Sequence, residues 1–238
     1  MFATPFKKRV QKGEGESPFW ISFADLMTAL MTLFLVVMAV TLVSVQKSIP
    51  DVIAKEASRQ KNIAIVMGLL KKESTPFAKV KVDAENFRLD LGEIVYFDSN
   101  SSAINSSDAA ELRAYVPVLL AVKQSENGRW IKRFIVEGFT DQDGTFTHNL
   151  KLSTDRSRSV ICSLVSPSPS TPRLSTEQLV NIQKYFSLGG FSSYSIREDK
   201  AKSRRAEIRI EFKTLSEMES EMKSGEPKVL LNNEFGVC

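Results

Sequence analysis

The hydrophobic pattern at the start of the chain is one long apolar run, from Phe19 to Val45, that contains a single charged residue, Asp25. As a helix this run would be about 40 Å long at roughly 1.5 Å per residue, whereas the apolar core of a bilayer is about 30 Å thick. A cleavable signal peptide has a shorter apolar region and a small-residue cleavage site, and this run has neither. The pattern therefore predicts a transmembrane helix over residues 18–46.

Charged and aromatic residues beside this run predict its orientation. Four basic residues precede it, Lys7, Lys8, Arg9 and Lys12. A basic segment before a membrane helix is typical of a cytoplasmic N-terminus. Trp20 stands where an interfacial aromatic anchor is expected. We therefore expect a cytoplasmic basic tail over residues 1–17, a single membrane pass, and the rest of the chain on the far side of the membrane.

Asp25 lies on a stripe of small and polar residues in the predicted membrane helix. The stripe follows the helical spacing and consists of Ser22, Asp25, Thr28, Ala29 and Thr32, while Leu26, Leu30, Leu33 and Val37 fall on the other side. A charge at this depth costs about 2.5–3.5 kcal/mol, so a passive anchor would be more stable with Leu. Two interpretations are open: Asp25 carries a proton or another cation, or it only mediates helix pairing.

Residues 47–79 show the pattern of an amphipathic helical connector. Its apolar positions are Ile49, Val52, Ile53, Ile63, Val66, Met67 and Leu70, with Lys, Glu and Gln on the other face. Pro50 favours a helix that starts there after a break, and the helix is expected to end before Pro76. The apolar face either pairs with a second copy of the chain or rests on the chain's own domain.

From Val80 onward the pattern mixes strands and helices. Alternation predicts strands at 87–91, 134–136 and 205–212, and helical spacing predicts helices at 106–124, 149–165 and 174–186. Ser106 or Ser107 is the expected N-cap of the first of these helices. Elements mixed in this order predict an α+β domain over residues 80–213. A polar C-terminal tail over residues 214–238 follows it.

The composition speaks against most classes of enzyme. With one His, His148, and two Cys, the chain lacks the usual ligands of a zinc site, and a Ser/His/Asp triad would depend on a single base. No GxxxxGK[ST] or GxGxxG motif occurs, and the pair Gly189-Gly190 alone is too weak a signal. Lys and Arg are interspersed with Asp and Glu at a net charge of +4, so there is no nucleic-acid stripe. We expect a protein that is not an enzyme and binds no metal, cofactor or nucleic acid.

The membrane run resembles the transmembrane signature of MotB-type stator subunits. The resemblance rests on the stretch PFWISFADLMTALMTLFLVVM, which begins at Pro18. The wording FWIS-F-ADLMTA and LFLVVM, with the basic segment before it, more closely resembles the ZorB subunits of Zorya anti-phage defence systems. This resemblance implies a bacterial inner-membrane protein with a periplasmic domain and Asp25 as the ion-carrying carboxylate. It also implies a dimer surrounded by a ring of MotA-like (ZorA-type) subunits.

A second set of motifs resembles the OmpA-like peptidoglycan-binding domain. The motifs are Gly138-Phe-Thr-Asp141, then Asn149, Leu152-Ser153 and Arg156, and Ser203-Arg-Arg-Ala-Glu-Ile208, over roughly residues 85–213. Phe139, Ser157 and Ser203 depart from the usual wording, in which His, Ala and Asn stand at these positions.

The pair Asp141 and Arg156 offers opposite charges to a zwitterion such as the diaminopimelate of a cell-wall stem peptide. Asp141 would accept from the ammonium, and Arg156 would bind the carboxylate. Asn149 and Leu152 would frame the pocket, with Thr140 and His148 at its edge. The alternative is a structural Asp–Arg ion pair that holds a loop to a helix.

Cys162, on a predicted helix, and Cys238, the last residue, are the two cysteines of the chain. On the far side of the membrane they are expected to form one disulfide that ties the tail to the domain. A bridge between two chains and a buried free Cys162 are the alternatives.

These observations together predict the B subunit of an ion-driven membrane motor in anti-phage defence, anchored to peptidoglycan. Asp25 would carry H⁺ or Na⁺, with Ser22, Thr28 and Thr32 along the ion path or in helix packing. The alternatives are a flagellar-type stator subunit and a static peptidoglycan tether without ion transport.

Overall fold

The computed structural model describes residues 17–166, 173–225 and 238. The basic tail and most of the loop from Ser166 to Pro172 therefore lie outside the described residues. The chain forms two compact units, Met1–Ala54 and Lys55–Cys238. Each is described below by itself.

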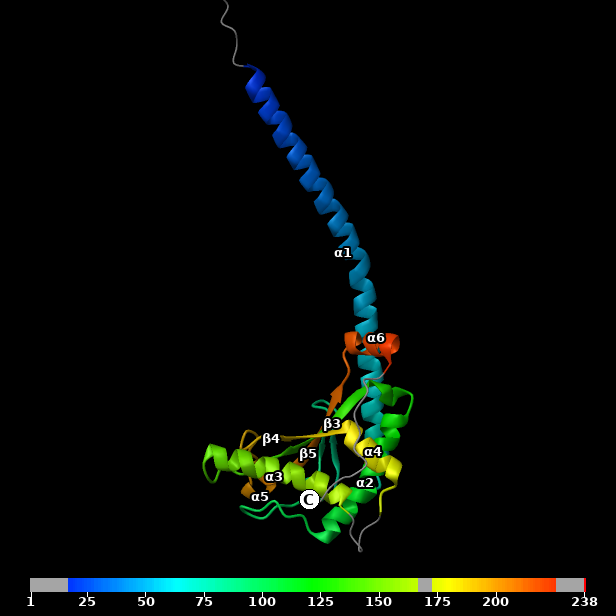
Figure 1. The fold of residues 1–238 in the computed structure, drawn as a ribbon, viewed down its shortest axis with the longest axis vertical. Helices are drawn as coiled ribbons and strands as arrows, with labels where there is room; N and C mark the ends of the chain where they lie inside the picture. Colours follow the sequence, from blue (N-terminus) through cyan, green and yellow to red (C-terminus); the bar gives the residue numbers. More distant parts are fainter. Residues whose placement is uncertain (1–16, 167–172, 226–237) are drawn as a thin grey trace, which may run out of the picture. The chain divides into compact units, whose positions relative to one another are not determined.

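Helix α1 (Ser17–Glu73) contains the predicted membrane segment and continues through Pro50 (Figure 1). The expected break at Pro50 is wrong. Proline lacks an N–H, so it removes one hydrogen bond to the carbonyl four residues earlier. Starting a new helix would require another nucleation step, which is unfavourable. The predicted end of the helix before Pro76 is confirmed, because α1 ends at Glu73.

The apolar face of the connector divides into two parts in the structure. Ile63, Val66, Met67 and Leu70 are buried in the core of the second unit, with 0–3% exposure. Ile49, Val52 and Ile53 keep 49–63% of their surface exposed. The later half of this face therefore rests on the chain's own domain, one of the two arrangements expected from the sequence.

The second unit is built on a five-stranded sheet with strand order β1-β2-β5-β3-β4. The strands are β1 (Lys81–Asp83), β2 (Arg88–Asp90), β3 (Ile131–Gly138), β4 (Phe186–Gly190) and β5 (Ala206–Phe212). All neighbours are antiparallel except β3 and β4, which run parallel, with Phe134 opposite Phe186 and Gly138 opposite Gly190. The α+β prediction is confirmed. The sequence pattern missed β1 and β4 and assigned Phe186 to a helix.

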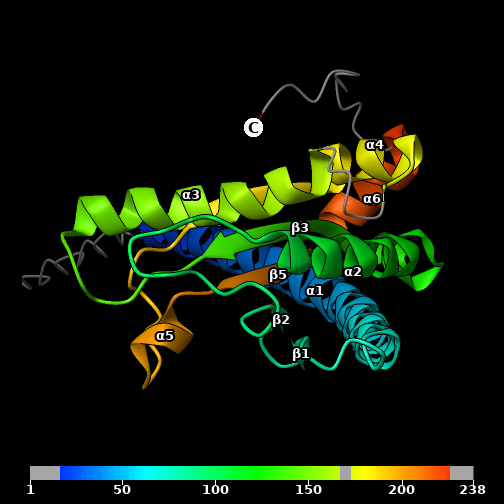
Figure 2. The same ribbon diagram turned by 90° about the horizontal axis from the view of Figure 1, so that it is seen from below.

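Helices cover this sheet. They are α2 (Ser106–Gln124), α3 (Phe146–Val165), α4 (Thr176–Tyr185), α5 (Lys200–Ser203) and α6 (Leu215–Ser224), with a short 3-10 helix, η1 (Asn127–Trp130). Figure 2 shows α3 running along β3 on one side of the sheet. The N-cap of α2 is Asn105 rather than Ser106 or Ser107, because the Asn105 side chain accepts from the Asp108 N–H at 2.8 Å.

Two glycines let α3 lie close to the sheet. A Cβ atom on Gly138 would come within 2.0 Å of the Ser153 carbonyl oxygen, and one on Gly190 within 2.2 Å of Thr154 Oγ1. Both positions therefore require the absence of a side chain. Of the pair Gly189-Gly190, it is Gly190 that this packing requires. This close approach places the middle of α3 beside the end of β3.

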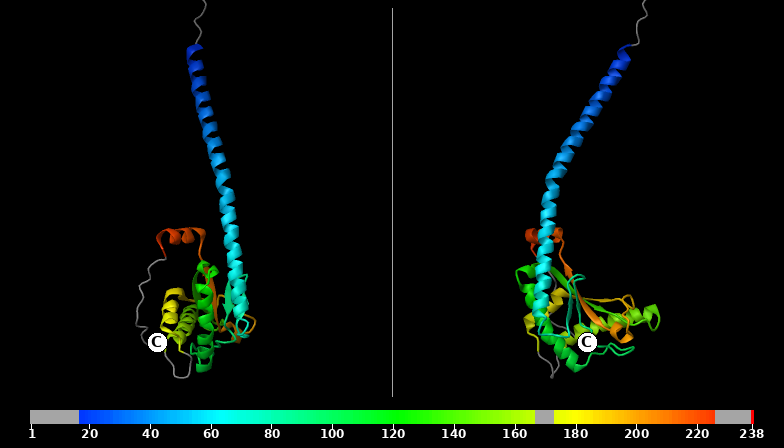
Figure 3. Two further views of the ribbon diagram at one scale, coloured as in Figure 1. Left: turned by 90° about the vertical axis from the view of Figure 1, so that its right-hand side faces the viewer. Right: turned by 180° about the vertical axis from the view of Figure 1, so that it is seen from behind.

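Part of the expected polar C-terminal tail forms the helix α6, which the sequence pattern did not predict. Thr214 and Glu217 form a capping box at its start. Glu219 pairs with Lys55 at 2.8 Å, and Arg59 Nε donates to the Lys213 carbonyl at 2.8 Å. These contacts place α6 beside the segment of α1 that belongs to this unit (Figure 3).

Candidate functional site

Asp25 is an exposed residue on α1, within a stretch long and apolar enough to cross a membrane. The hydroxyl of Thr28 donates to the Asp25 carbonyl, and that of Thr32 donates to the Ala29 carbonyl, both at 2.9 Å. Both threonine protons are therefore bound to the helix backbone. Within the described residues, no donor or cation contacts the Asp25 carboxylate.

The second candidate site is formed where β3 ends and α3 begins. Asp141 follows β3 closely and is 6% exposed. Gly144, at φ +100°, turns the chain, and Thr145 caps α3 by accepting from the His148 N–H at 3.4 Å. Asn149 Nδ2 donates to the Asp141 carbonyl at 3.4 Å, which fixes the loop against the helix. The structure therefore brings Asp141 and Asn149 together, as the sequence spacing predicted.

Arg156 lies beneath this loop and is fully buried, with 0% exposure. Its Nε donates to the Ser101 carbonyl at 2.9 Å, Nη1 to that of Phe139 at 2.8 Å, and Nη2 to that of Asp98 at 3.0 Å. Burial lowers the pKa of Arg156 to about 10, with nearby Asp141 opposing and Arg204 adding to the shift. Arg156 therefore stays charged near neutral pH and ties three backbone segments together.

Arg204 is the residue of this site that the sequence analysis missed. Its Nη1 pairs with Asp141 Oδ2 at 3.1 Å, and its Nε donates to the Phe97 carbonyl at 3.0 Å. Lys200 of the same segment pairs with Asp143 at 2.7 Å, and this hydrogen bond raises the pKa of Lys200. The signal is present in the stretch Ser203-Arg-Arg, which by itself indicates only the fold.

The remaining predicted residues lie around this turn. Thr140 is 1% exposed, and its hydroxyl has no partner within the described ranges. His148 is exposed, and its Nε2 lies 2.8 Å from Asn100 Oδ1, a contact that joins α3 to the Asp98–Ser101 loop. Leu152 is half-buried on α3. The contacts of His148 and Arg156 therefore hold the same loop from two sides.

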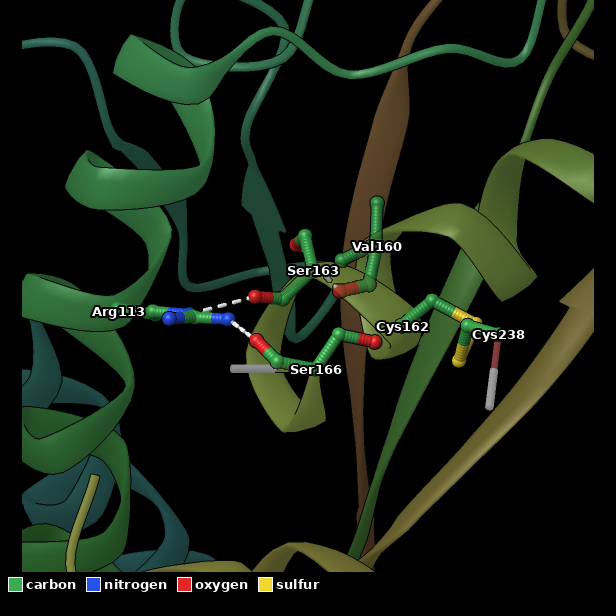
Figure 4. Close-up of a disulfide and its surroundings, with 6 residues drawn as sticks. All are labelled: Arg113, Val160, Cys162, Ser163, Ser166 and Cys238. Carbon is green, nitrogen blue, oxygen red and sulfur yellow. Dashed lines mark hydrogen bonds between the residues drawn. A yellow bond between two sulfur atoms is a disulfide. The ribbon is translucent and has the colours of Figure 1, made fainter. Parts of the chain in front are cut away.

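The expected disulfide is present within the chain. Cys162 and Cys238 are bonded, with their Cα atoms 5.8 Å apart (Figure 4). Beside it, the Arg113 guanidinium from α2 donates to the Ser163 carbonyl at 2.6 Å and to that of Ser166. The C-terminal turn of α3 is thus held both by a covalent bond and by a buried cation at the end of the helix.

Comparisons with known proteins show which families this chain resembles. Residues 6–49 match the family model described as membrane MotB of the proton-channel complex MotA/MotB. The chain is 42% identical over 217 residues to the Zorya protein ZorB of Escherichia coli O139:H28 (strain E24377A / ETEC). That match covers 89% of this chain and 88% of the E. coli protein.

Two solved structures are also similar over part of this chain. The periplasmic domain of Helicobacter pylori MotB is 19% identical, with 59% of this chain and 85% of that chain covered at a TM-score of 0.40. The cell wall anchor of the T6SS from Pseudomonas aeruginosa is 19% identical, with 60% and 95% covered at a TM-score of 0.38.

An apolar N-terminal helix with a MotB-like sequence, followed by an α+β domain, defines a MotB-like subunit. These features fit a single-pass inner-membrane protein. The chain belongs to the ZorB family of Zorya proteins.

Proposed function

We propose that this protein is the ion-carrying, wall-anchored B subunit of a Zorya motor complex. The ZorB family consists of MotB-like stator subunits rather than enzymes. The observation that carries the proposal is Asp25, the one carboxylate in the apolar run of α1. A carboxylate in lipid is far less costly when protonated, so a group that binds and releases an ion inside a helix bundle has a physical reason to be there.

The transported ion in this proposal is H⁺. The description of the family model that matches residues 6–49 names a proton-channel complex. Asp25 would therefore work as a proton carrier within a homodimer, surrounded by MotA-like membrane subunits. The C-terminal unit would then lie in the periplasm.

The C-terminal domain would anchor the complex to peptidoglycan. The pocket proposed for the stem peptide is formed by Asp141, Asn149, Leu152 and Arg156, with Thr140 and His148 beside it. Diaminopimelate carries an ammonium and a carboxylate on one carbon, and a carboxylate beside guanidinium groups is complementary to both charges. An anchored domain would give the membrane complex a fixed point against which to exert torque.

The test is phage survival in cells that carry the complete operon with variant protein at matched abundance. Asp25→Asn is expected to abolish protection, because the amide has the shape of the acid but cannot exchange a proton. Thr41→Val is the matched control, because Thr41 lies further along the same helix and its hydroxyl likewise donates to a backbone carbonyl, and it is expected to retain protection. Equal effects of the two changes would contradict ion carriage and favour a static tether. Unchanged protection with Asp25→Asn would remove Asp25 from the mechanism.

A further inference from the structure

The five-stranded sheet has one apolar face and one charged face. A Cβ atom on Gly138 would meet α3, and successive side chains of a strand point to opposite faces, so Glu137 points away from that helix. Buried apolar side chains pair across the three central strands on the α3 face, at Leu89, Phe134, Val136, Ile208 and Ile210. The opposite face of the same strands, called the charged face below, includes Arg88, Asp90, Glu137, Glu207 and Arg209.

Two arginines of the charged face are held side by side by one buried carboxylate. Arg88 of β2 and Arg209 of β5 are direct partners in the strand register, a position in which Cβ atoms are about 4.5–5.5 Å apart. Glu137 has no exposed side-chain surface; its Oε2 accepts from Arg88 Nη1 at 2.5 Å, and its Oε1 accepts from Arg209 Nε at 2.6 Å. Each oxygen of Glu137 therefore orients a different guanidinium group.

Both guanidinium groups keep unused donors and accessible surface. The Arg88 side chain is 29% exposed and that of Arg209 is 36% exposed. Arg88 uses Nη1 alone, which also donates to Glu207 at 2.7 Å, and Arg209 uses Nε alone. Among the described residues, the other two nitrogen atoms of each group bond to no acceptor. The pair therefore presents donors from two adjacent cations.

The surrounding ion pairs leave the charged face with a positive charge. Glu207 also accepts from Arg197 at 3.1 Å and from Arg205 at 2.7 Å, and Arg197 pairs with Asp90 at 2.6 Å. With the two arginines and Glu137 above, four arginines meet three carboxylates, which leaves a charge of +1. Like charges directly opposite each other in a sheet destabilise it, so an anion beside Arg88 and Arg209 would relieve their repulsion.

We propose that the Arg88–Arg209 pair is a binding site for a phosphate group, carried as a monoester or a diester. A single guanidinium fork already satisfies both oxygens of a carboxylate, whereas two adjacent forks match the larger number of acceptor oxygens on a phosphate. A second copy of this chain bound through the same face would place arginines against arginines, which repel. The proposal is independent of the functions proposed for Asp25 and Asp141.

The test is thermal unfolding of the full-length protein in a phosphate-free detergent and buffer, with increasing concentrations of added anion. The probes are inorganic phosphate, glycerol 3-phosphate as a monoester, bis(glycerol) phosphate as a diester, and acetate as a carboxylate. Sodium chloride at equal ionic strength corrects for screening. A ligand of the folded state raises the unfolding temperature in a concentration-dependent way, which gives an apparent Kd.

Inorganic phosphate is expected to raise the unfolding temperature saturably above sodium chloride, and acetate is not. Arg209→Gln should weaken phosphate binding by roughly 10- to 100-fold, because charged hydrogen bonds are lost. Its amide can still donate to Glu137. Arg133→Gln is the matched control, because Arg133 lies on the same face, is 44% exposed and pairs with Glu211, and its affinity should equal that of wild type. Binding of glycerol 3-phosphate alone would identify a monoester ligand, and equal binding of bis(glycerol) phosphate would identify a diester.

Three results would overturn the proposal. They are the absence of a saturable rise above sodium chloride, an equal rise with acetate, and an equal loss of affinity in Arg209→Gln and Arg133→Gln. Unfolding without added anion shows whether each variant is folded. If Arg209→Gln is not, Arg209→Lys decides, because a point charge without the fork should lower the affinity several-fold, and an unchanged affinity contradicts the site.

Discussion

Replacing Arg156 by lysine tests whether this buried cation holds the candidate wall-binding site together. The guanidinium donates to the carbonyls of Asp98, Ser101 and Phe139 at 2.8–3.0 Å, from a side chain with no exposed surface. A lysine ammonium is a compact point charge and would reach about one of these carbonyls. Arg156→Lys therefore keeps the charge and removes roughly two of the three bonds.

The expected loss of stability follows from these two bonds. Hydrogen bonds to charged groups contribute about 1.5–3 kcal/mol each. The lower end applies here, because Asp98 lies on an exposed loop where water can replace the lost donor. Arg156→Lys should then reduce the free energy of unfolding by about 3 kcal/mol, which corresponds to about 6–12 °C in Tm for a domain of this size.

The assay is thermal unfolding of the full-length protein in detergent, followed by circular dichroism. Arg158→Lys is the matched control, because Arg158 is exposed on the same helix and should change Tm by no more than about 2 °C. Hydrogen exchange in the 98–101 loop should become faster in Arg156→Lys alone. If the Tm values of the two variants agree within about 1–2 °C, the three carbonyl contacts do not stabilise the domain, and the reasoning is refuted.

Two further predictions concern the periphery of the domain. Glu217 has its pKa lowered to about 2 from about 4.5, mainly by its hydrogen bond to Lys132. Such a carboxyl stabilises the fold fully above its unfolded pKa, and the contribution is lost as the pH falls to the folded pKa. The stability advantage of wild type over Glu217→Gln should therefore shrink between about pH 4.5 and 2 in denaturant titrations. A constant difference across that range would refute the pairing. Ser192 has a φ of +52°, and its buried hydroxyl has no partner among the described residues. Ser192→Gly should therefore raise the free energy of unfolding by roughly 1 kcal/mol, as measured by urea unfolding. A loss of stability would show that its hydroxyl has a partner.

The elements found from the sequence were those with a strong local signal. Helix α2 spans Ser106–Gln124, the range predicted from its apolar spacing. In contrast, β1 has three residues and β4 ends in two glycines, so neither has an alternating pattern long enough to recognise. Helix α6 was missed although its capping box, Thr214 with Glu217, is a sequence-level signal of a helix start.

The candidate site was only partly predictable for a different reason. The spacing of Asp141 and Asn149 within one turn and helix can be read locally, and the structure joins them. The partners of Arg156 are backbone carbonyls up to 58 residues away, and backbone groups have no residue-specific signal in a sequence. The partner of Asp141 is Arg204, 63 residues further along the chain. Long-range contacts of this kind follow from the strand order, which the sequence pattern does not provide.

The buried carboxylates of the domain have ion-pair partners within the chain, whereas Asp25 of α1 has none among the described residues. In the domain, buried Glu137 is paired with Arg88 at 2.5 Å and with Arg209 at 2.6 Å, and Asp141 is paired with Arg204. Asp25 has no such partner within the described residues, although its ionised form would cost about 2.5–3.5 kcal/mol in a membrane. A segment with exposed apolar residues and an uncompensated carboxylate is stable only when other helices or water surround that group. The domain's contacts can therefore be tested on a single chain, whereas the chemistry proposed for Asp25 has to be measured in the assembled complex.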